Sequence, residues 1–164
     1  SGKQQPSIAK HDLILQLSSI ILGFENYAQQ KQINLMWKPP QNDLFVYYDS
    51  DIIEKCVSNL LSNAFKHTPE EGKIGVSLTL IHDIQAGKKK VKSVQIQVLD
   101  TGKGIASEHL NHIFDRFYQV PESMNRAGTG VGLSLCKELI ELHLGEIDVK
   151  SKLGEGSNFS INFQ

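Results

Sequence analysis

The sequence predicts a two-layer α/β sandwich (an α+β fold), in which a mixed β-sheet is covered on one face by about three helices. Three long segments carry apolar residues at helical spacing. Several shorter segments show the apolar–polar alternation of strands, and consecutive ones are joined by short turns. Because the helices are grouped rather than alternating with single strands, this order favours a mixed or antiparallel sheet over a purely parallel one.

The length and composition fit one globular domain. The chain has 164 residues, of which 40% are hydrophobic and 21% charged, and these shares are ordinary for a soluble protein. The net charge of −1 gives no reason to expect a surface for nucleic acid or for an anionic membrane. We therefore interpret residues 1–164 as a single domain, in which residues 1–3 resemble a cloning remnant.

The first third of the chain predicts one helix and two strands. Apolar residues at helical spacing extend from Asp12 to Ile33, and the Asp12 side chain could cap the start of this helix. Short apolar runs around Leu35 and over 44–48 predict strands. Pro39-Pro40 marks a break between these two runs.

The remaining elements follow the same reasoning. A second helix is expected from about Ser50 to His67. Alternation predicts two strands over 74–80 and 91–98, joined by a lysine-containing hairpin loop over 84–92. A third helix is expected over 131–144 with Gly145 at its C-cap. The last two strands are expected over 147–151 and 157–163.

The two cysteines and the lack of a long apolar stretch favour a reducing, aqueous environment. Cys56 and Cys136 both fall in helical patterns among apolar neighbours. We expect buried, reduced thiols at these positions rather than a disulfide. No window of about 18 apolar residues occurs, so no part of this sequence is expected to span a bilayer or to contact one directly.

The second predicted helix carries polar residues on one face. Asn59 and Asn63 are four residues apart and Lys66 lies three further on, so the three side chains project from the same side. Carboxamide oxygens can bind Mg²⁺, and a lysine can bind phosphate. Taken alone, this pattern fits a solvated polar face at least as well.

Two glycine-containing segments could hold a nucleotide. Asp100 follows a predicted strand directly and precedes Gly102 and Gly104, so a fixed carboxylate could accept from an exocyclic amine while the glycines let a flat ring approach. An ordinary turn is the alternative interpretation. The segment 128–132, Gly-Thr-Gly-Val-Gly, leads into the third helix, and amide groups at a helix start favour phosphate binding.

Five motifs occur together in one order. They are NLLSNAFK at 59–66, DTGKG at 100–104, FDRFY at 114–118, GTGVGL at 128–133 and GEGSNF at 154–159. Together they resemble the catalytic ATP-binding domain of bacterial sensor histidine kinases, within the superfamily that includes gyrase, Hsp90 and MutL. The first four look like the N box, the first glycine box, the F box and the second glycine box of that family. The resemblance covers nearly the whole chain, and the motifs are highly specific as a set.

The resemblance implies that the chain binds ATP and Mg²⁺. Asn63 would be the metal ligand, with Asn59 beside the phosphates or the metal and Lys66 on phosphate. His67 would lie beside the nucleotide, where the family often has an aromatic residue. Asp100 would accept from the adenine amino group.

The glycine boxes and a later hydroxyl complete the implied nucleotide site. Gly102 and Gly104 would lie close to the base, and Ser157 would lie near the adenine. The second glycine box would form the phosphate-side hinge of a mobile lid over roughly 107–127. This box comprises Gly128, Thr129, Gly130, Val131, Gly132 and Leu133. Arg126 is our candidate for reaching the γ-phosphate.

One position distinguishes branches of the superfamily. The hydrolytic relatives place a water-activating Glu four residues before the metal-binding Asn, where this chain has Asn59. An amide cannot act as a general base near neutral pH. Phosphoryl transfer to an external acceptor is therefore favoured over hydrolysis. The alternatives are a catalytically silent nucleotide-binding regulatory module and a serine kinase of the anti-sigma type.

The phosphoacceptor histidine is not evident in this sequence. Only His11 has a neighbouring acid, and no proline follows it as in the family's acceptor motif, so we interpret it as a surface residue beside a helix cap. His109 and His112 are three apart, but no third metal ligand is evident, and we interpret them as lid-surface histidines. The resemblance implies that the partners are a separate helical dimerisation and phosphoacceptor domain and a response regulator. It also implies a monomeric, cytoplasmic domain of a parent protein anchored in the inner membrane.

Overall fold

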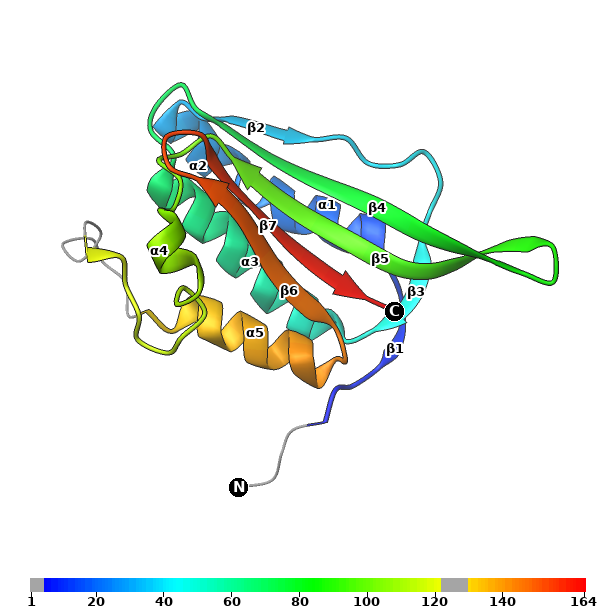
Figure 1. The fold of residues 1–164 in the computed structure, drawn as a ribbon. Coiled ribbons are helices and arrows are strands. Elements are labelled where there is room, and N and C mark those ends of the chain that lie inside the picture. The colour runs from blue at the N-terminus through cyan, green and yellow to red at the C-terminus, as the bar shows by residue number, and fades with distance from the viewer. Residues whose placement is uncertain (1–4, 122–129) are drawn as a thin grey trace.

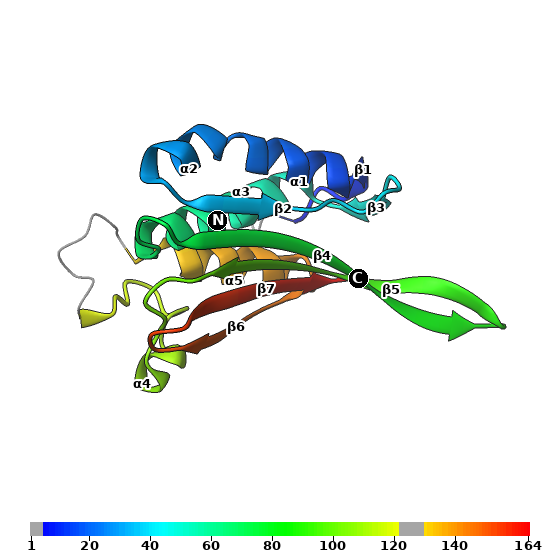
Figure 2. The same ribbon diagram turned by 90° about the horizontal axis from the view of Figure 1, so that it is seen from above.

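The computed structural model describes residues 5–121 and 130–164. A five-stranded sheet has the order β2-β4-β5-β7-β6. In it β2 and β4 are parallel, whereas the other neighbouring pairs are antiparallel. Its strands are β2 Asn34–Trp37, β4 Lys73–Gln85, β5 Lys88–Asp100, β6 Glu146–Lys152 and β7 Gly156–Phe163. The helices pack on one face of this sheet (Figures 1 and 2), which confirms the predicted two-layer fold.

The helix predicted over 12–33 is two helices in the structure. These are α1 (Leu13–Leu22) and α2 (Glu25–Lys31), and the Asp12 side chain caps α1 by accepting from the Leu15 amide. The chain breaks at Gly23 and Phe24. This break lets the Phe24 ring stack on Phe65 of the next helix, with centroids 5.6 Å apart and planes 6° from parallel. Gly23 is the C-cap of α1, and the break that follows it is accompanied by this tertiary contact.

A second, two-stranded sheet lies beside α1. Strand β1 (Ala9–Asp12) pairs antiparallel with β3 (Phe45–Tyr48). The strand β3 was expected from its apolar run, whereas β1 has too short and too polar a sequence to be recognised alone. The pairing of β1 with β3 continues to Asp12, the residue that caps α1.

The lysine-containing segment between the two central strands is not a loop. Strands β4 and β5 continue as a ribbon to a two-residue turn at Ala86 and Gly87, whose φ angles of 51° and 72° suit a type I′ hairpin. The prediction of a loop over 84–92 is therefore wrong. Both faces of the ribbon are exposed beyond His82, so its sequence lacks the alternation that reveals a half-buried strand.

Helices α3 and α5 lie side by side behind the sheet (Figure 1). The predicted bounds of α3, Ser50–His67, are confirmed. Helix α5 spans Gly132–Leu142, and Leu144 rather than Gly145 adopts the left-handed conformation after it, at φ 58°. Gly145 instead allows close packing on β7, because a Cβ there would lie 2.5 Å from the carbonyl oxygen of Asn162.

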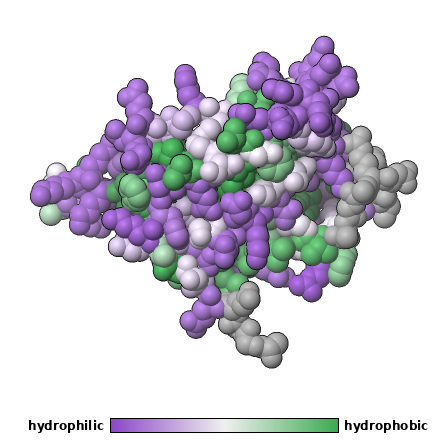
Figure 3. Space-filling model, turned by 180° about the vertical axis from the view of Figure 1, so that it is seen from behind, coloured by the Kyte–Doolittle hydropathy of each residue, from purple (hydrophilic) through white to green (hydrophobic). Residues whose placement is uncertain are grey.

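The hydrophobic core lies between the helices and the sheet. Residues from α1, α3, β5 and β7 form one buried cluster that includes Leu17, Leu61, Ile96 and Ile161. Both cysteines are free and buried in it, as expected. Seen from the helical side, the surface is mostly hydrophilic with small scattered hydrophobic areas (Figure 3). Among the described residues, no helix is long and apolar enough to cross a membrane.

Candidate functional site

A cavity of about 410 Å³ opens between α3, the end of β5, the start of α5 and the segment before residue 121. This volume is in the range of small-molecule sites. Ten residues predicted for the nucleotide site line it: Asn59, Asn63, Lys66, His67, Asp100, Gly104, Gly130, Gly132, Leu133 and Ser157. The chain thus gathers one site from four motifs that are far apart in the sequence.

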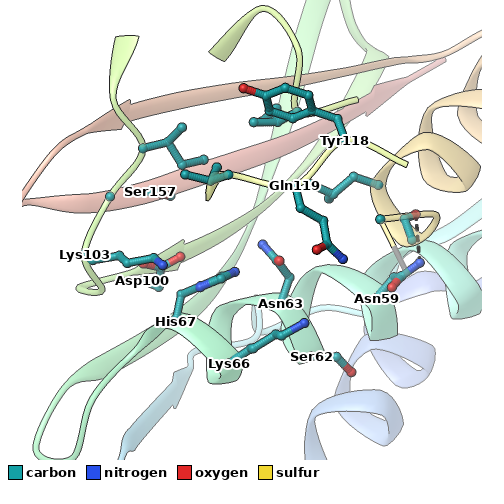
Figure 4. A pocket seen from close by; sticks show the side chains of 17 residues that line it. Asn59, Ser62, Asn63, Lys66, His67, Asp100, Lys103, Tyr118, Gln119 and Ser157 are labelled. Carbon is teal, nitrogen blue, oxygen red and sulfur yellow. Dashed lines mark hydrogen bonds between the residues drawn. The ribbon is translucent and has the colours of Figure 1, made fainter. Parts of the chain in front are cut away.

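Helix α3 forms one wall of the cavity. Asp49 caps the helix by accepting from the amides of Asp51 and Ile52, and its apolar stripe is buried against the sheet. The polar residues expected on one face do turn toward the cavity. Figure 4 shows Asn63 pointing into it from α3, opposite Gln119, while His67 lies nearer to Asp100. Lys66 and His67 stand in the last turn of α3, where positive charge is favoured by the helix dipole.

Asn59 joins the two helices at the back of the cavity. Its side-chain nitrogen donates to the carbonyl oxygen of Gly132 at 2.9 Å (dashed in Figure 4). A Cβ at Gly132 would lie 2.6 Å from the Asn59 amide oxygen, so a larger residue there would require the Asn59 side chain to move. The side chain predicted to lie beside phosphate is therefore also a bridge between α3 and the first turn of α5.

Asp100 occupies the opposite wall, at the end of β5. Its side chain is 8% exposed, and one carboxylate oxygen accepts from the Gly102 amide at 2.9 Å. Burial raises the pKa of Asp100, although backbone hydrogen bonds from Gly102 and Ser157 oppose that shift. The carboxylate is thus held by its own turn and by the neighbouring strand β7, at the edge of the cavity.

Close backbone approaches position this carboxylate. A Cβ at Gly102 would lie 2.5 Å from the His67 carbonyl oxygen, which ties the end of α3 to the turn after β5. Gly104 has φ +72°, and a Cβ there would lie 2.1 Å from the Lys152 carbonyl oxygen. Gly156, which was not among the predicted site residues, would place a Cβ 2.0 Å from the Asp100 carbonyl oxygen. Its positive φ of 105° is a signal that only the structure reveals.

Some predicted residues lie elsewhere. Gly102 and Val131 are beside the cavity without lining it. Arg126, Gly128 and Thr129, together with most of the second half of the expected lid, fall outside the described residues. Their assigned contacts with phosphate stay predictions.

The cavity also has lining residues that were given no role from the sequence. Tyr118 and Gln119 lie on the wall opposite α3 (Figure 4). Tyr118 belongs to the recognised FDRFY motif, and its hydroxyl hydrogen-bonds with the His109 ring. The side chain of His109 is only 13% exposed, so its interpretation as a surface histidine is wrong. The ring contact with Tyr118 buries it. His112 is exposed and pairs with Asp115 at 3.0 Å.

The described residues contain no group of three or more His, Cys, Asp or Glu side chains that could hold a metal ion. A Mg²⁺ ion nevertheless fits the polar lining of the cavity. Mg²⁺ binds oxygen, keeps several waters, and is commonly held by one or two protein groups together with substrate phosphates. The Asn63 amide oxygen is the protein ligand that the sequence predicts, and it faces the cavity.

Comparisons with known proteins identify the family of this chain. Residues 48–164 match the family of histidine kinase-, DNA gyrase B-, and HSP90-like ATPases. The adaptive-response sensory kinase SasA of Rippkaea orientalis is 34% identical over 157 residues, which cover 94% of this chain and 38% of that protein. The sensor protein SrrB of Staphylococcus aureus is 40% identical over 116 residues, covering 70% of this chain and 18% of SrrB. The chain therefore spans well under half of these relatives.

Solved structures show the same fold. The nucleotide-free catalytic domain of histidine kinase ThkA superposes with a TM-score of 0.78 at 25% identity, over 96% of this chain and 97% of that domain. Full-length ShkA in complex with AMPPNP gives a TM-score of 0.81 at 24% identity, over 99% of this chain and 32% of ShkA.

Proposed function

The chain belongs to the family of histidine kinase-, DNA gyrase B-, and HSP90-like ATPases, and we propose that it binds ATP·Mg²⁺ and donates the γ-phosphoryl group to a histidine on a separate helical domain. The observation that carries this proposal is that Asp100, at the end of β5, and Asn63, on α3, line one cavity. One wall offers a carboxylate for an exocyclic amine. The other offers an amide oxygen for a metal ion beside a lysine for phosphate.

The base end of the cavity is the end of β5. An aspartate that is already held by backbone amides keeps a fixed position, and its free lone pairs can accept from the adenine amino group. Ser157 lies beside it through the register of β5 and β7, in which Asp100 pairs with Ser157. Gly104 lines the cavity at this end, and its lack of a side chain leaves room for the backbone of Lys152 behind it.

The phosphate end lies along α3 and the start of α5. Asn63 and Lys66 approach the cavity from α3, and Gly130 and Gly132 bring the backbone near it from the other side. A helix start with its amide groups free favours phosphate oxygens. Bound Mg²⁺ would neutralise phosphate charge, whereas this chain's own residues would hold and orient the nucleotide.

The position of the acidic side chain in the cavity favours phosphoryl transfer over ATP hydrolysis. Asp100 is the only carboxylate among the described residues that line it, and it lies at the base end. Asn59 stands where a water-activating Glu would be needed, and it donates to Gly132. Within residues 5–121 and 130–164, no lining carboxylate is therefore placed to activate water near the phosphates.

The acceptor and the partners belong to the same proposal. The relatives SasA and SrrB are named as a sensory kinase and a sensor protein. By analogy, we propose a helical dimerisation and phosphoacceptor domain and a response regulator as partners. The family match begins at residue 48. We also propose that residues 5–47 belong to the same domain as the matched residues, because Leu13 and Leu17 of α1 are fully buried in the shared core.

Calorimetric titration with a non-hydrolysable ATP analogue and Mg²⁺ tests the binding site. We expect Asp100→Asn to weaken binding about tenfold or more with and without Mg²⁺, the loss typical of a hydrogen bond to a charged group. Asn63→Ala should weaken binding chiefly when Mg²⁺ is present. Exposed Asp83→Asn on the hairpin serves as the matched control. Unchanged affinity in both site variants would contradict the assignment.

Labelling with ATP that carries a radioactive γ-phosphate tests where the acceptor lies. We expect the 164-residue chain alone to remain unlabelled. Addition of a separate helical phosphoacceptor domain should then give a label that is lost in acid, as expected for phosphohistidine. Robust labelling of the isolated chain would contradict the placement of the acceptor outside this sequence.

A further inference from the structure

Two buried thiols meet where α3 and α5 pack together. Cys56 of α3 and Cys136 of α5 are 0% and 1% exposed. The Cys56 sulfur lies 3.8 Å from the Cys136 carbonyl oxygen, and the Cys136 sulfur lies 3.9 Å from the Cys56 carbonyl oxygen. This reciprocal arrangement brings the two thiols close together, and each one donates to the backbone carbonyl oxygen of the other residue. Residues separated by 80 positions thus form one two-thiol cluster.

The thiol pair lies directly behind the candidate site. Cys56 is three residues before Asn59 on α3, and Cys136 is four residues after Gly132 on α5. The Asn59 side chain donates to the Gly132 carbonyl oxygen at 2.9 Å, and it also lies close enough to Cys136 to lower the pKa of that thiol. Both Asn59 and Gly132 line the cavity. One side chain therefore connects the sulfur pair to the cavity wall.

The two thiols have different chemistry. The hydrogen bond from Cys56 lowers the pKa of the Cys136 thiol, against the opposing effect of burial, and the hydrogen bond from Asn59 adds to this lowering. The same thiol–thiol hydrogen bond, together with burial, raises the pKa of Cys56. The thiolate, which is the reactive form of cysteine, therefore forms first at Cys136, with a protonated thiol adjacent to it.

We propose that Cys56 and Cys136 form a reversible disulfide modification site, closed by a hydroperoxide and opened by a thiol reductant, which controls the nucleotide cavity. The Cys136 thiolate attacks the peroxide oxygen, giving a sulfenic acid and releasing hydroxide (or an alkoxide). Cys56 then attacks the sulfenic sulfur. The S–S bond forms, and the sulfenic oxygen leaves as water with the Cys56 proton. In sum, the peroxide is reduced and the two thiols are oxidised by two electrons.

Closure of the disulfide would change the cavity through Asn59. A disulfide bond is about 2.05 Å long, far shorter than the contact between two unbonded thiols. Helix α5 must therefore shift or rotate against α3, which would strain the hydrogen bond from Asn59 on α3 to the Gly132 carbonyl oxygen at the start of α5. We expect nucleotide affinity to fall about fivefold, as for one neutral hydrogen bond. This effect rests on the proposed nucleotide binding, whereas the disulfide itself does not.

The disulfide is tested by mass spectrometry on the whole 164-residue chain. Treatment with hydrogen peroxide should remove the mass of two hydrogen atoms, and a peptide map should show the segments around residues 56 and 136 linked. Dithiothreitol should restore both thiols. The linked peptide should be absent from Cys56→Ala and from Cys136→Ala. If peroxide oxidises the exposed Met36 (45% exposed) while both cysteines remain free thiols, the proposal is wrong.

The coupling is tested by titrating an ATP analogue with Mg²⁺ into reduced and oxidised protein. We expect the roughly fivefold loss of affinity in oxidised wild type, full recovery after reduction, and no effect of peroxide on Cys136→Ala, which lacks the attacking thiol. A disulfide that forms without a change in affinity would overturn the control of the cavity. If the reduced chain fails to bind nucleotide, the proposed function fails instead, and the peptide map still decides whether the disulfide forms.

Discussion

A glycine with the same φ angle lies beyond each end of strand β5, but the two glycines are needed for different reasons. Gly87 at the hairpin tip and Gly104 beyond the cavity end both have φ +72°. A Cβ added at Gly87 would meet no atom within 4 Å, whereas one at Gly104 would lie 2.1 Å from the Lys152 carbonyl oxygen. At the tip, glycine serves only the turn. At the cavity, it also lets a second segment of backbone come close.

This difference extends to the residues around each glycine. The tip is a two-stranded ribbon with both faces in solvent, where Ile84 is 77% exposed. At the other end, the turn after β5 contacts the end of α3 at His67 and the turn between β6 and β7. Asp100 lies at this junction and is 8% exposed. Strand β5 is therefore paired with β4 in solvent at its ribbon end, whereas two other segments pack against the turn at its other end.

The largest effect is expected from alanine at these two glycines. Gly104→Ala adds backbone strain and a clash with a carbonyl that cannot move aside, so we expect a loss of about 3 kcal/mol in the free energy of unfolding. Gly87→Ala adds the strain alone and should cost about 1 kcal/mol. Denaturant titration of both variants measures the difference. Equal losses would show that the close approach at Gly104 contributes nothing.

The second expected effect is a pH dependence that belongs to Asp100. Burial raises the pKa of this carboxyl, and its protonated form is a weaker acceptor than the carboxylate. As the pH falls through that raised pKa, affinity for an ATP analogue should fall by about tenfold. Calorimetry across pH checks this, with Asp83→Asn on the ribbon as a variant that should keep the wild-type profile. If Asp100→Asn shows the same pH dependence of affinity as the wild type, another group is responsible for the titration.

The stability of the chain should respond to the same proton in the opposite direction. Because the folded pKa of Asp100 is raised above the unfolded value, the folded chain binds this proton more tightly. Protonation of Asp100 therefore increases the free energy of unfolding as the pH falls from the raised pKa of the folded chain toward the pKa of the unfolded chain. This stabilisation is lost as the pH rises through the pKa of the folded chain. Comparing wild type with Asp100→Asn by denaturant titration isolates this contribution.

A smaller effect is expected on the helix that faces the cavity end of β5. Asn59→Ala removes the donor to the Gly132 carbonyl oxygen, so we expect a loss of about 1 kcal/mol in unfolding free energy. Ser62→Ala, an exposed position on the same helix, should be nearly neutral. Thermal unfolding of the pair gives the comparison. If the two variants melt together, the bridge between α3 and α5 has no energetic role.

The smallest effect is expected at the ribbon tip. Ile84→Lys exchanges an exposed apolar side chain for a charged one among lysines, and should change the unfolding free energy by less than about 0.5 kcal/mol. Affinity for the ATP analogue should stay at the wild-type value. A clear loss of affinity would show that the ribbon communicates with the cavity, and would remove the contrast between the two ends of β5.

Local signals were sufficient for the elements that bury one face against the core. Helix α3 was predicted with its observed bounds because its apolar stripe is continuous from Ile52 to Ala64 and Pro69 follows it closely. The break at Gly23 was not predicted because apolar residues continue at helical spacing beyond it, and in the structure Phe24 stacks on Phe65 of α3. The ribbon over 84–92 was missed because a strand exposed on both faces carries no periodic signal.

The sequence by itself determined the fold class, the family resemblance and most residues of the candidate site, because each motif is local and its side-chain chemistry can be read in order. Only the tertiary structure decided how these motifs meet. Asn59 bridges to Gly132, and Gly156 admits the backbone of Asp100. Cys56 meets Cys136 across two helices. Such contacts join residues distant in sequence, and they depend on strand register and helix packing, which no local pattern encodes.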